Sequence, residues 1–303
     1  MSLIKQLKLN KKNYFIIPIF VLVLSISPIL SIAQTLKDEQ NSRTIKFYYT
    51  LQNSTNKPIK KAEFWTFGPV SFSKIQSNTE ITSNYQYITQ FDKLGNQIFH
   101  YTFNNFPPFA SKIIMININF KNTFRQNTDE LNHDSLDLFL SPEKFVESNA
   151  KKIVLLAHSL NSKDNQQKTI ENIYQWVINN LSYSGYIKNS RGALWALNNK
   201  KGDCTEYMYL FVALCRANKI PARCIGGYVV TKNKIIDASD YHNWAEFFLN
   251  GKWEIADPQK QCLMKNKEQY IAMKIMSHHA ENHITDFQRF KVSGEGIKVR
   301  MGQ

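Results

Sequence analysis

The sequence predicts an α+β protein in which an antiparallel β-sandwich precedes a core of helices packed on an antiparallel sheet. Two changes of texture along the 303 residues indicate this class. Residues 44–124 alternate apolar and polar side chains with a period of two, which is typical of half-buried strands. After about residue 127, apolar side chains recur at helical spacing, and strand patterns then return, as in α+β folds. Hydrophobic residues make up 43% and charged residues 20%, the balance of a globular chain.

The first 33 residues have the build of a secretory signal peptide. Four lysines precede an almost uncharged apolar run from Tyr14 to Ala33, which ends in small residues where a signal peptidase reads. An uncleaved membrane anchor is the alternative, because the run approaches the ~20 residues that span a bilayer. Pro18, Pro28 and the small-residue end favour cleavage. We therefore expect a chain exported to the periplasm or secreted, with membrane contact only if residues 1–33 stay attached.

The formal charge is +14, and +10 remains once the four leader lysines are subtracted. Such a balance favours anionic partners. The lysines are scattered, however, and basic runs such as Lys60-Lys61 and Lys200-Lys201 are short. Because no basic stripe with interleaved aromatic residues is present, we do not expect a nucleic-acid partner.

Residues 34–126 read as a β-rich domain. The segments 44–53 and 112–120 alternate with a period of two, and turn signals such as Gly68-Pro69 separate the strand patterns. Short strands at this spacing suggest a small antiparallel sandwich. His100 reads as a half-exposed strand residue. A cell-envelope partner could bind this domain, which holds no cluster of titratable side chains that suggests chemistry.

Residues 127–285 read as a second domain, followed by a C-terminal strand or tail at 286–303. A helix is expected to begin at the Ser141-Pro142-Glu143 signal, and His158 near its end reads as structural. The next helix places six apolar residues on one face: Ile170, Ile173, Tyr174, Val177, Ile178 and Leu181. A third helix follows Cys204 and buries Tyr207, Leu210, Phe211 and Leu214. The segments 224–230, 242–249 and 252–258 read as strands.

Cys204 stands at the start of the third helix. Unpaired N–H groups and the helix dipole there favour a thiolate, which is the nucleophilic form. Asp203 and Glu206 are nearby anions that oppose this effect, so a partner cation is required. A disulfide or a buried thiol is the alternative.

The other cysteines give a less specific signal. The four thiols of Cys204, Cys215, Cys224 and Cys262 allow three pairings. Cys215 reads as a small buried hydrophobic residue, and Cys224 and Cys262 could pair or stay reduced. None lies in a Cys-x-x-Cys motif, so a zinc site is not favoured.

His242 and Asp257 are the candidate partners of Cys204. His242 precedes one strand, Asp257 ends the next, and the turn at Asn250-Gly251 makes these strands a hairpin. The order cysteine, histidine, aspartate supplies a nucleophile, a base and a residue that orients the base.

Three separated motifs together resemble the transglutaminase-like superfamily, whose members have papain-like folds with a Cys-His-Asp triad. The motifs are Gly202-Asp203-Cys204, the following helix through Arg223, and "HNWAEFFLNGKWEIADP" from His242, and the resemblance runs from about Glu143 to Asp257. It implies that Cys204 is the nucleophile, that His242 is the general base and acid, and that Asp257 holds the imidazole.

The resemblance also implies supporting residues. Arg223 is then a structural marker, and Trp244 packs behind the site. The backbone N–H of Cys204 is expected in the oxyanion hole. A side-chain donor from upstream is expected too, with Trp176 as the first candidate and Tyr183 and Trp195 as others. The alternative for Trp176 is a core position on its helix.

The family implies acyl transfer through a thioester. We expect hydrolysis of a peptide or amide bond in an exported or cell-envelope peptide or protein substrate. Gln–Lys crosslinking or deamidation is one alternative, and a non-catalytic binding module with the same fold is another. We expect no cofactor and no metal, since calcium-binding loops of the EF-hand kind are missing from the sequence.

Overall fold

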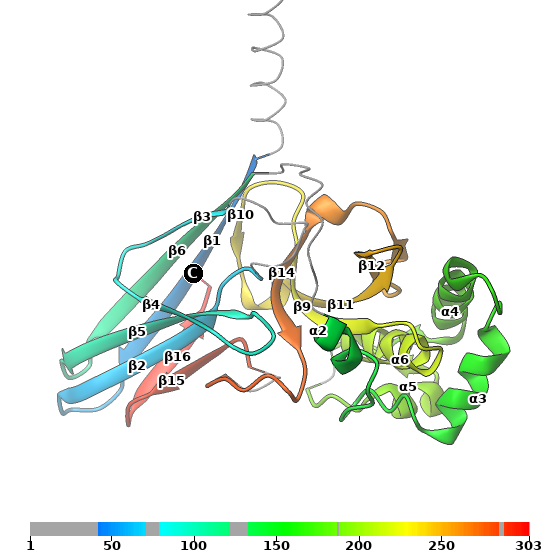
Figure 1. The fold of residues 1–303 in the computed structure, drawn as a ribbon. Helices are drawn as coiled ribbons and strands as arrows, with labels where there is room; N and C mark the ends of the chain where they lie inside the picture. The colour runs from blue at the N-terminus through cyan, green and yellow to red at the C-terminus, as the bar shows by residue number, and fades with distance from the viewer. Residues whose placement is uncertain (1–41, 71–78, 122–132, 187, 285–287, 303) are drawn as a thin grey trace, which may run out of the picture. The chain divides into compact units, whose positions relative to one another are not determined.

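The computed structural model describes residues 42–70, 79–121, 133–186, 188–284 and 288–302 (Figure 1). The leader predicted at residues 1–33 lies outside these residues, as do the domain borders predicted near 126 and 285. Among the described residues, no helix combines the length and the apolar character needed to cross a membrane.

Two sheets form the β-sandwich predicted from period-two alternation. The first joins β10, β1, β6 and β3 in that order, with β16 also paired to β1, and the second joins β15, β2, β5 and β4. The strands from the first part of the chain are β1 Ser42–Asn53, β2 Ile59–Phe67, β3 Thr79–Ser83, β4 Ile88–Phe91, β5 Gln97–Phe106 and β6 Ser111–Lys121.

Alternate residues of β1 fill the core of the sandwich. Phe47, Tyr49 and Leu51 are buried, and the Tyr49 ring lies 5.0 Å from that of Phe64 on β2. Burial of one face of each strand is what the alternating pattern predicted.

The sandwich also takes strands from later parts of the chain. β15 (Phe290–Ser293) pairs with β2, and β16 (Ile297–Met301) pairs with β1, both antiparallel. β10 (Lys234–Ile236) pairs with β1 in parallel. The predicted C-terminal strand therefore exists, and it completes the sandwich.

A second sheet-and-helix unit carries the Cys204 motif. Its sheet has the order β13-β12-β11-β9-β14. The strands are β9 Ala222–Val229, β11 Tyr241–Leu249, β12 Lys252–Asp257, β13 Cys262–Leu263 and β14 Tyr270–Met276, with short 3-10 turns at Ala238–Asp240 and Lys267–Gln269. The helices are α2 His133–Leu138, α3 Lys151–Leu160, α4 Gln166–Asn180, α5 Ala193–Asn199 and α6 Cys204–Ala217. β7 (Ser182–Tyr183) and β8 (Lys201–Gly202) form a separate two-stranded parallel ladder.

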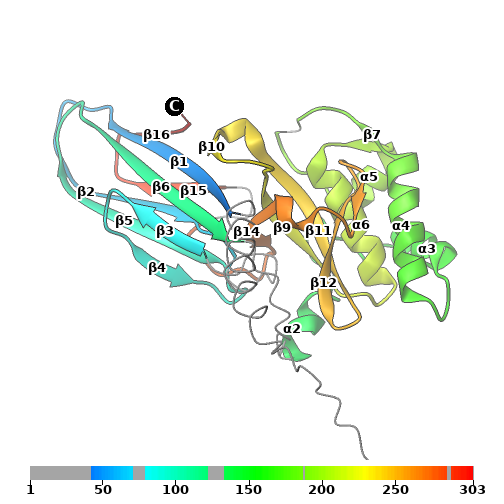
Figure 2. The same cartoon turned by 90° about the horizontal axis from the view of Figure 1, so that it is seen from above.

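Helix α6 is the centre of this unit (Figure 2). It packs against β9 and β11 on one side and against α3, α4 and α5 on the others. The sequence predicted one apolar face, yet every residue from Thr205 to Arg216 is buried. The polar members are tolerated because they are paired: Arg216 binds the Glu143 carboxylate at 2.8 Å.

The start predicted for the first helix of this unit, at Ser141, is wrong. Residues 141–150 form turns, and α3 begins only at Lys151. Phe145 has a positive φ of 71°, and Glu143 and Val146 exchange backbone hydrogen bonds, which excludes a helix here. The ion pair of Glu143 with Arg216 fixes this segment in a way that local sequence does not reveal.

The connection from β9 to β11 is held by the sandwich. The Arg43 guanidinium on β1 donates to the carbonyl oxygen of Val230, directly after β9. β10, in the middle of the connection, adds its strand to β1. This connection leads into Tyr241 and His242, so the sandwich anchors the chain just before the predicted base.

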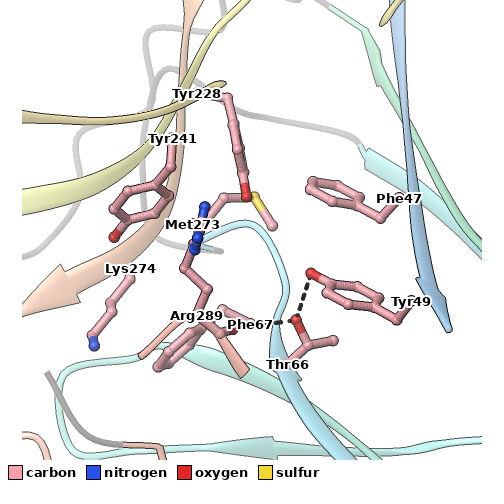
Figure 3. A pocket seen from close by; sticks show the side chains of 9 residues that line it. All are labelled: Phe47, Tyr49, Thr66, Phe67, Tyr228, Tyr241, Met273, Lys274 and Arg289. Carbon is pink, nitrogen blue, oxygen red and sulfur yellow. Dashed lines mark hydrogen bonds between the residues drawn. The ribbon is translucent and has the colours of Figure 1, made fainter. Parts of the chain in front are cut away.

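A small cavity marks the same junction (Figure 3). It has room for little more than a water molecule. Arg289, which precedes β15, reaches into it with its guanidinium 5.3 Å from the centre of the Tyr241 ring and donates to the carbonyl oxygen of Ala238. Thr66 on β2 binds the Arg289 carbonyl at 3.4 Å and the Tyr49 hydroxyl at 3.0 Å.

Candidate active site

Cys204 is the first residue of α6 and is partly exposed. The Asp203 carboxylate caps the helix by accepting the N–H of Thr205 at 2.8 Å, and the Glu206 carboxylate accepts the N–H of Asp203 at 3.2 Å. This capping box fixes the first turn of α6, and the Cys204 thiol lies at the N-terminal end of that turn. Gly202 is required before it, because a Cβ there would lie 2.3 Å from that of Glu206.

The electrostatics at Cys204 differ from the expectation of a lowered pKa. Burial raises the pKa of the thiol to about 11, and the Asp203 carboxylate adds to the rise. The backbone N–H of Asn243 and the hydroxyl of Thr205 act in the opposite direction, since both donate to the sulfur. Position at a helix start is therefore not enough, and the thiolate needs a cation, as the acidic neighbours indicated.

His242 and Asp257 lie beside each other, as the sequence predicted. His242 is the second residue of β11, Asp257 is the last of β12, and Nε2 of the imidazole lies 2.6 Å from Oδ2 of the carboxylate. The exposed fractions of 7% and 1% show that the pair is shielded from water. Because Nε2 is engaged with Asp257, Nδ1 is the nitrogen that can exchange a proton with a thiol.

Hydrogen bonds to Thr205 and Cys204 join the strand of His242 to the helix of Cys204. The Asn243 side chain donates to the Thr205 hydroxyl at 2.9 Å, and the Asn243 N–H donates to the Cys204 sulfur. Asn243 and Thr205, which directly follow the predicted base and the predicted nucleophile, therefore link β11 to α6. Neither Asn243 nor Thr205 was predicted as a site residue, although each directly follows His242 or Cys204 in the sequence.

Asp257 has two more partners. The Tyr270 hydroxyl donates to Oδ2 at 3.0 Å, and the N–H of Lys260 donates to Oδ1 at 3.0 Å. Burial and the Asp257 charge raise the pKa of Tyr270, which keeps the phenol protonated as a donor. Tyr270 was not predicted, because it comes from β14 on the far edge of the sheet.

Trp244 lies behind the imidazole. Its exposed fraction is 1%, and its ring is stacked with that of His242 at 6.4 Å between centres. It also meets Tyr270 edge-on at 5.2 Å. This placement agrees with the packing role that the resemblance implied.

The upstream candidates lie in different surroundings. Trp176 is half-buried on α4, with the Lys200 ammonium 4.0 Å from its ring, and Trp195 carries the Arg191 guanidinium at 4.6 Å. Tyr183 pairs with Gly202 in the β7–β8 ladder. Partial burial and the charges of Cys204 and Asp203 raise the pKa of Tyr183.

All four cysteines are reduced. Cys215 is fully buried on α6, as expected, and Cys224 and Cys262, whose pairing the sequence left open, are not joined.

Arg223 makes structural contacts within the sheet, as the resemblance implied. It binds Glu246 with two nitrogens at 2.8 and 2.6 Å and stacks over Trp253 at 4.1 Å. Among the described residues, no group of three or more His, Cys, Asp or Glu side chains could hold a metal ion.

Residues 155–258 match the profile of the transglutaminase-like superfamily. This segment, which holds Cys204, His242 and Asp257, belongs to that superfamily, and the predicted resemblance is confirmed.

One solved structure shares the fold. A candidate cysteine protease from Cytophaga hutchinsonii has 18% sequence identity and a TM-score of 0.55, over 86% of this chain and 91% of that chain. The periplasmic domain of TgpA from Pseudomonas aeruginosa, bound to ethylmercury, has 13% identity and a TM-score of 0.40, over 77% of this chain and 96% of that chain. No curated protein matches the sequence. The predicted α+β class with a transglutaminase-like core is confirmed.

Proposed function

We propose that the protein is a cysteine-dependent acyl-transfer enzyme in which Cys204, His242 and Asp257 form the catalytic triad. The observation that carries this proposal is the buried 2.6 Å hydrogen bond between His242 and Asp257, on a strand that Asn243 ties to the first turn after Cys204. A buried imidazole with one nitrogen fixed by a carboxylate is oriented for proton transfer at the other nitrogen.

The reaction begins when Nδ1 of His242 takes the thiol proton and the Cys204 sulfur attacks a carbonyl carbon. A carbon–sulfur bond forms and the carbonyl π electrons move to oxygen. When this oxyanion collapses, the carbon–nitrogen bond breaks, and the imidazolium gives its proton to the leaving amine. Water then attacks the thioester while His242 accepts a proton from it. The carbon–sulfur bond breaks, the acid is released, and the imidazolium returns the proton to the Cys204 sulfur.

Two donors are candidates for stabilising the oxyanion. The N–H of Cys204 belongs to the first turn of α6, where N–H groups have no partner in the helix. Tyr183 is a better side-chain candidate than Trp176, because Tyr183 pairs with Gly202, two residues before Cys204, while the Lys200 ammonium covers the Trp176 ring. Each such donor supplies transition-state stabilisation worth about 10²–10³ in rate.

Hydrolysis of peptide or amide bonds in exported or cell-envelope substrates is the activity we favour. It is supported by the leader-like sequence at residues 1–33 and by the β-rich domain that precedes the core. Crosslinking and deamidation use the same thioester and differ in the acceptor. Both are therefore outcomes of the same assay.

The test compares acceptors directly. Mature protein is incubated with a denatured protein substrate in ¹⁸O-water, with and without a fluorescent primary amine, and the products are read by mass spectrometry. New termini carrying ¹⁸O indicate peptide hydrolysis, a Gln-to-Glu change indicates deamidation, and amine-tagged Gln indicates transamidation. Cys204→Ala should abolish all three, while Cys215→Ala on the same helix should keep them. Full turnover by Cys204→Ala would show that the triad assignment is wrong.

A further inference from the structure

The chain just before the nucleophile carries an unusual charge. Residues 181–202 contain four basic side chains, Lys188, Arg191, Lys200 and Lys201, and no aspartate or glutamate. All four of these side chains are exposed. A one-signed surface beside a reactive group concentrates ligands of the opposite charge there.

This segment leads directly into Asp203 and Cys204, and its two ends pair with each other. Tyr183 pairs with Gly202, and the N–H of Ser184 donates to the Gly202 carbonyl at 3.0 Å. In the middle of the segment, the N–H of Arg191 donates to the Glu206 carboxylate, in the first turn of α6, at 2.9 Å. Arg191 is therefore tied to the helix of Cys204, and Lys200 and Lys201 precede Cys204 by four and three residues.

Two exposed aromatic rings accompany the basic side chains. The exposed fractions of Tyr183 and Tyr186 are 57% and 84%. Aromatic residues, tyrosine among them, are enriched at protein contact surfaces relative to the rest of the surface. The Arg191 and Lys200 side chains are stacked on Trp195 and Trp176, which restricts where their charges lie.

The nearby carboxylates do not cancel this charge at the surface. Asp203 and Glu206 are buried and bound to backbone N–H groups of the first turn. Glu147 is half-buried and accepts the N–H of Leu194 at 3.2 Å. The exposed face of the segment therefore remains positive.

We propose that Tyr183, Tyr186, Lys188, Arg191, Lys200 and Lys201 form a substrate strip that selects acidic peptides as acyl donors. This inference rests on the proposed function and specifies its substrate class. An extended peptide laid along the strip places carboxylates against the four cations and apolar side chains against the two tyrosines. Its scissile carbonyl then reaches the first turn of α6.

The test measures binding without catalysis, in full mature chain carrying Cys204→Ala. The probe is a fluorescent peptide with Glu on both sides of a central Gln, and the matched peptide has every Glu replaced by Gln. Fluorescence anisotropy should show the acidic peptide binding roughly ten-fold more tightly at low salt. The preference should shrink above about 0.1 M salt, where the Debye length is about 10 Å.

Two charge-reversing double variants test whether the preference for the acidic peptide comes from the substrate strip. With Lys188→Glu and Arg191→Glu together, the acidic peptide should lose its preference by roughly ten-fold or more. Lys298→Glu with Arg300→Glu, on exposed positions of β16, makes the same change in net charge and should leave the preference intact. Thermal unfolding of both double variants checks that they are folded.

Three results would overturn the proposal. One is equal binding of the two peptides, and another is an equal loss in the β16 control, which would show an effect of net charge alone. The third is tighter binding of polyphosphate than of the peptide, which would indicate a general polyanion surface. Thiol labelling of wild-type Cys204 is measured in parallel. Reactive Cys204 without a preference for the acidic peptide would contradict the substrate strip alone, whereas unreactive Cys204 would contradict the proposed catalytic function.

Discussion

Tyr270 donates its hydroxyl to Oδ2 of Asp257, the same oxygen that lies 2.6 Å from the imidazole of His242. One carboxylate oxygen therefore holds two side chains, from β11 and β14. The phenol prevents Asp257 from rotating away from His242, because rotation would break a buried hydrogen bond of 3.0 Å.

Tyr270→Phe should lower kcat roughly five- to thirty-fold and leave KM unchanged, since the bond is worth about 1–2 kcal/mol and acts through His242. Steady-state kinetics on a hydrolysed peptide measure this. Tyr207→Phe is the matched control, because its hydroxyl donates to the Leu181 carbonyl at 2.7 Å, away from the triad. It should lower the unfolding temperature and keep kcat. Equal losses in both variants would argue against a positioning role for Tyr270.

The reactivity of Cys204 should depend on His242 in a defined way. With its pKa raised to about 11, the isolated thiol is protonated at neutral pH. In His242→Ala, labelling by iodoacetamide should therefore keep rising with pH beyond pH 9. In wild type, an imidazolium that stabilises the thiolate should give a plateau between about pH 6 and 8. Mass spectrometry identifies the labelled cysteine, and a pH profile identical in the two proteins would rule out the ion pair.

Glu206 should make stability depend on pH. Burial raises the pKa of its carboxyl from 4.5 to about 7. Between these values the folded protein holds a proton that the unfolded chain releases, so the contribution is complete below about pH 4.5 and lost as pH rises to 7. The loss is on the order of 3 kcal/mol.

Urea unfolding at pH 5 and pH 8 tests this dependence. Glu206→Gln should be less sensitive to pH than wild type. Glu171→Gln, on the surface of α4, should behave like wild type. If Glu206→Gln retains the full decrease, another group is responsible.

Arg289, which precedes β15 of the sandwich, should support catalysis by holding the chain segment before His242. Its guanidinium holds the Ala238 carbonyl and the Tyr241 ring, directly before His242. Arg289→Met should reduce kcat and the neutral-pH labelling of Cys204 by roughly ten-fold, because a small displacement of the base is costly. Arg289→Lys should recover only part, as an ammonium cannot stack as a planar group does.

Arg300→Met, on the exposed face of β16, is the control for that change. It should leave kcat and labelling unchanged. Normal labelling in Arg289→Met would mean that the contact serves only stability.

Sequence patterns predicted the elements whose signals are local. The period-two segments became β1 and β6, and the helical spacing from Ile170 became α4. The contact of His242 with Asp257 followed from a hairpin, where the turn brings neighbouring strands together.

The rest depended on contacts between distant parts of the chain. The pairing of β10, β15 and β16 with the sandwich has no local signal, because edge strands choose partners by tertiary packing. Tyr270 reaches Asp257 across the sheet, and the raised pKa of Cys204 comes mainly from burial. Burial by surrounding elements is not visible around a single cysteine in a sequence.

The parallel pairing of β10 with β1 has a consequence for how the molecule can be divided. A cut at the predicted border near residue 126 would separate β1 from β10, and a cut near 285 would remove Arg289, β15 and β16. Neither fragment would keep the support of the chain that precedes His242. The two halves should therefore melt in a single transition, and neither half should be transferable to another protein by itself.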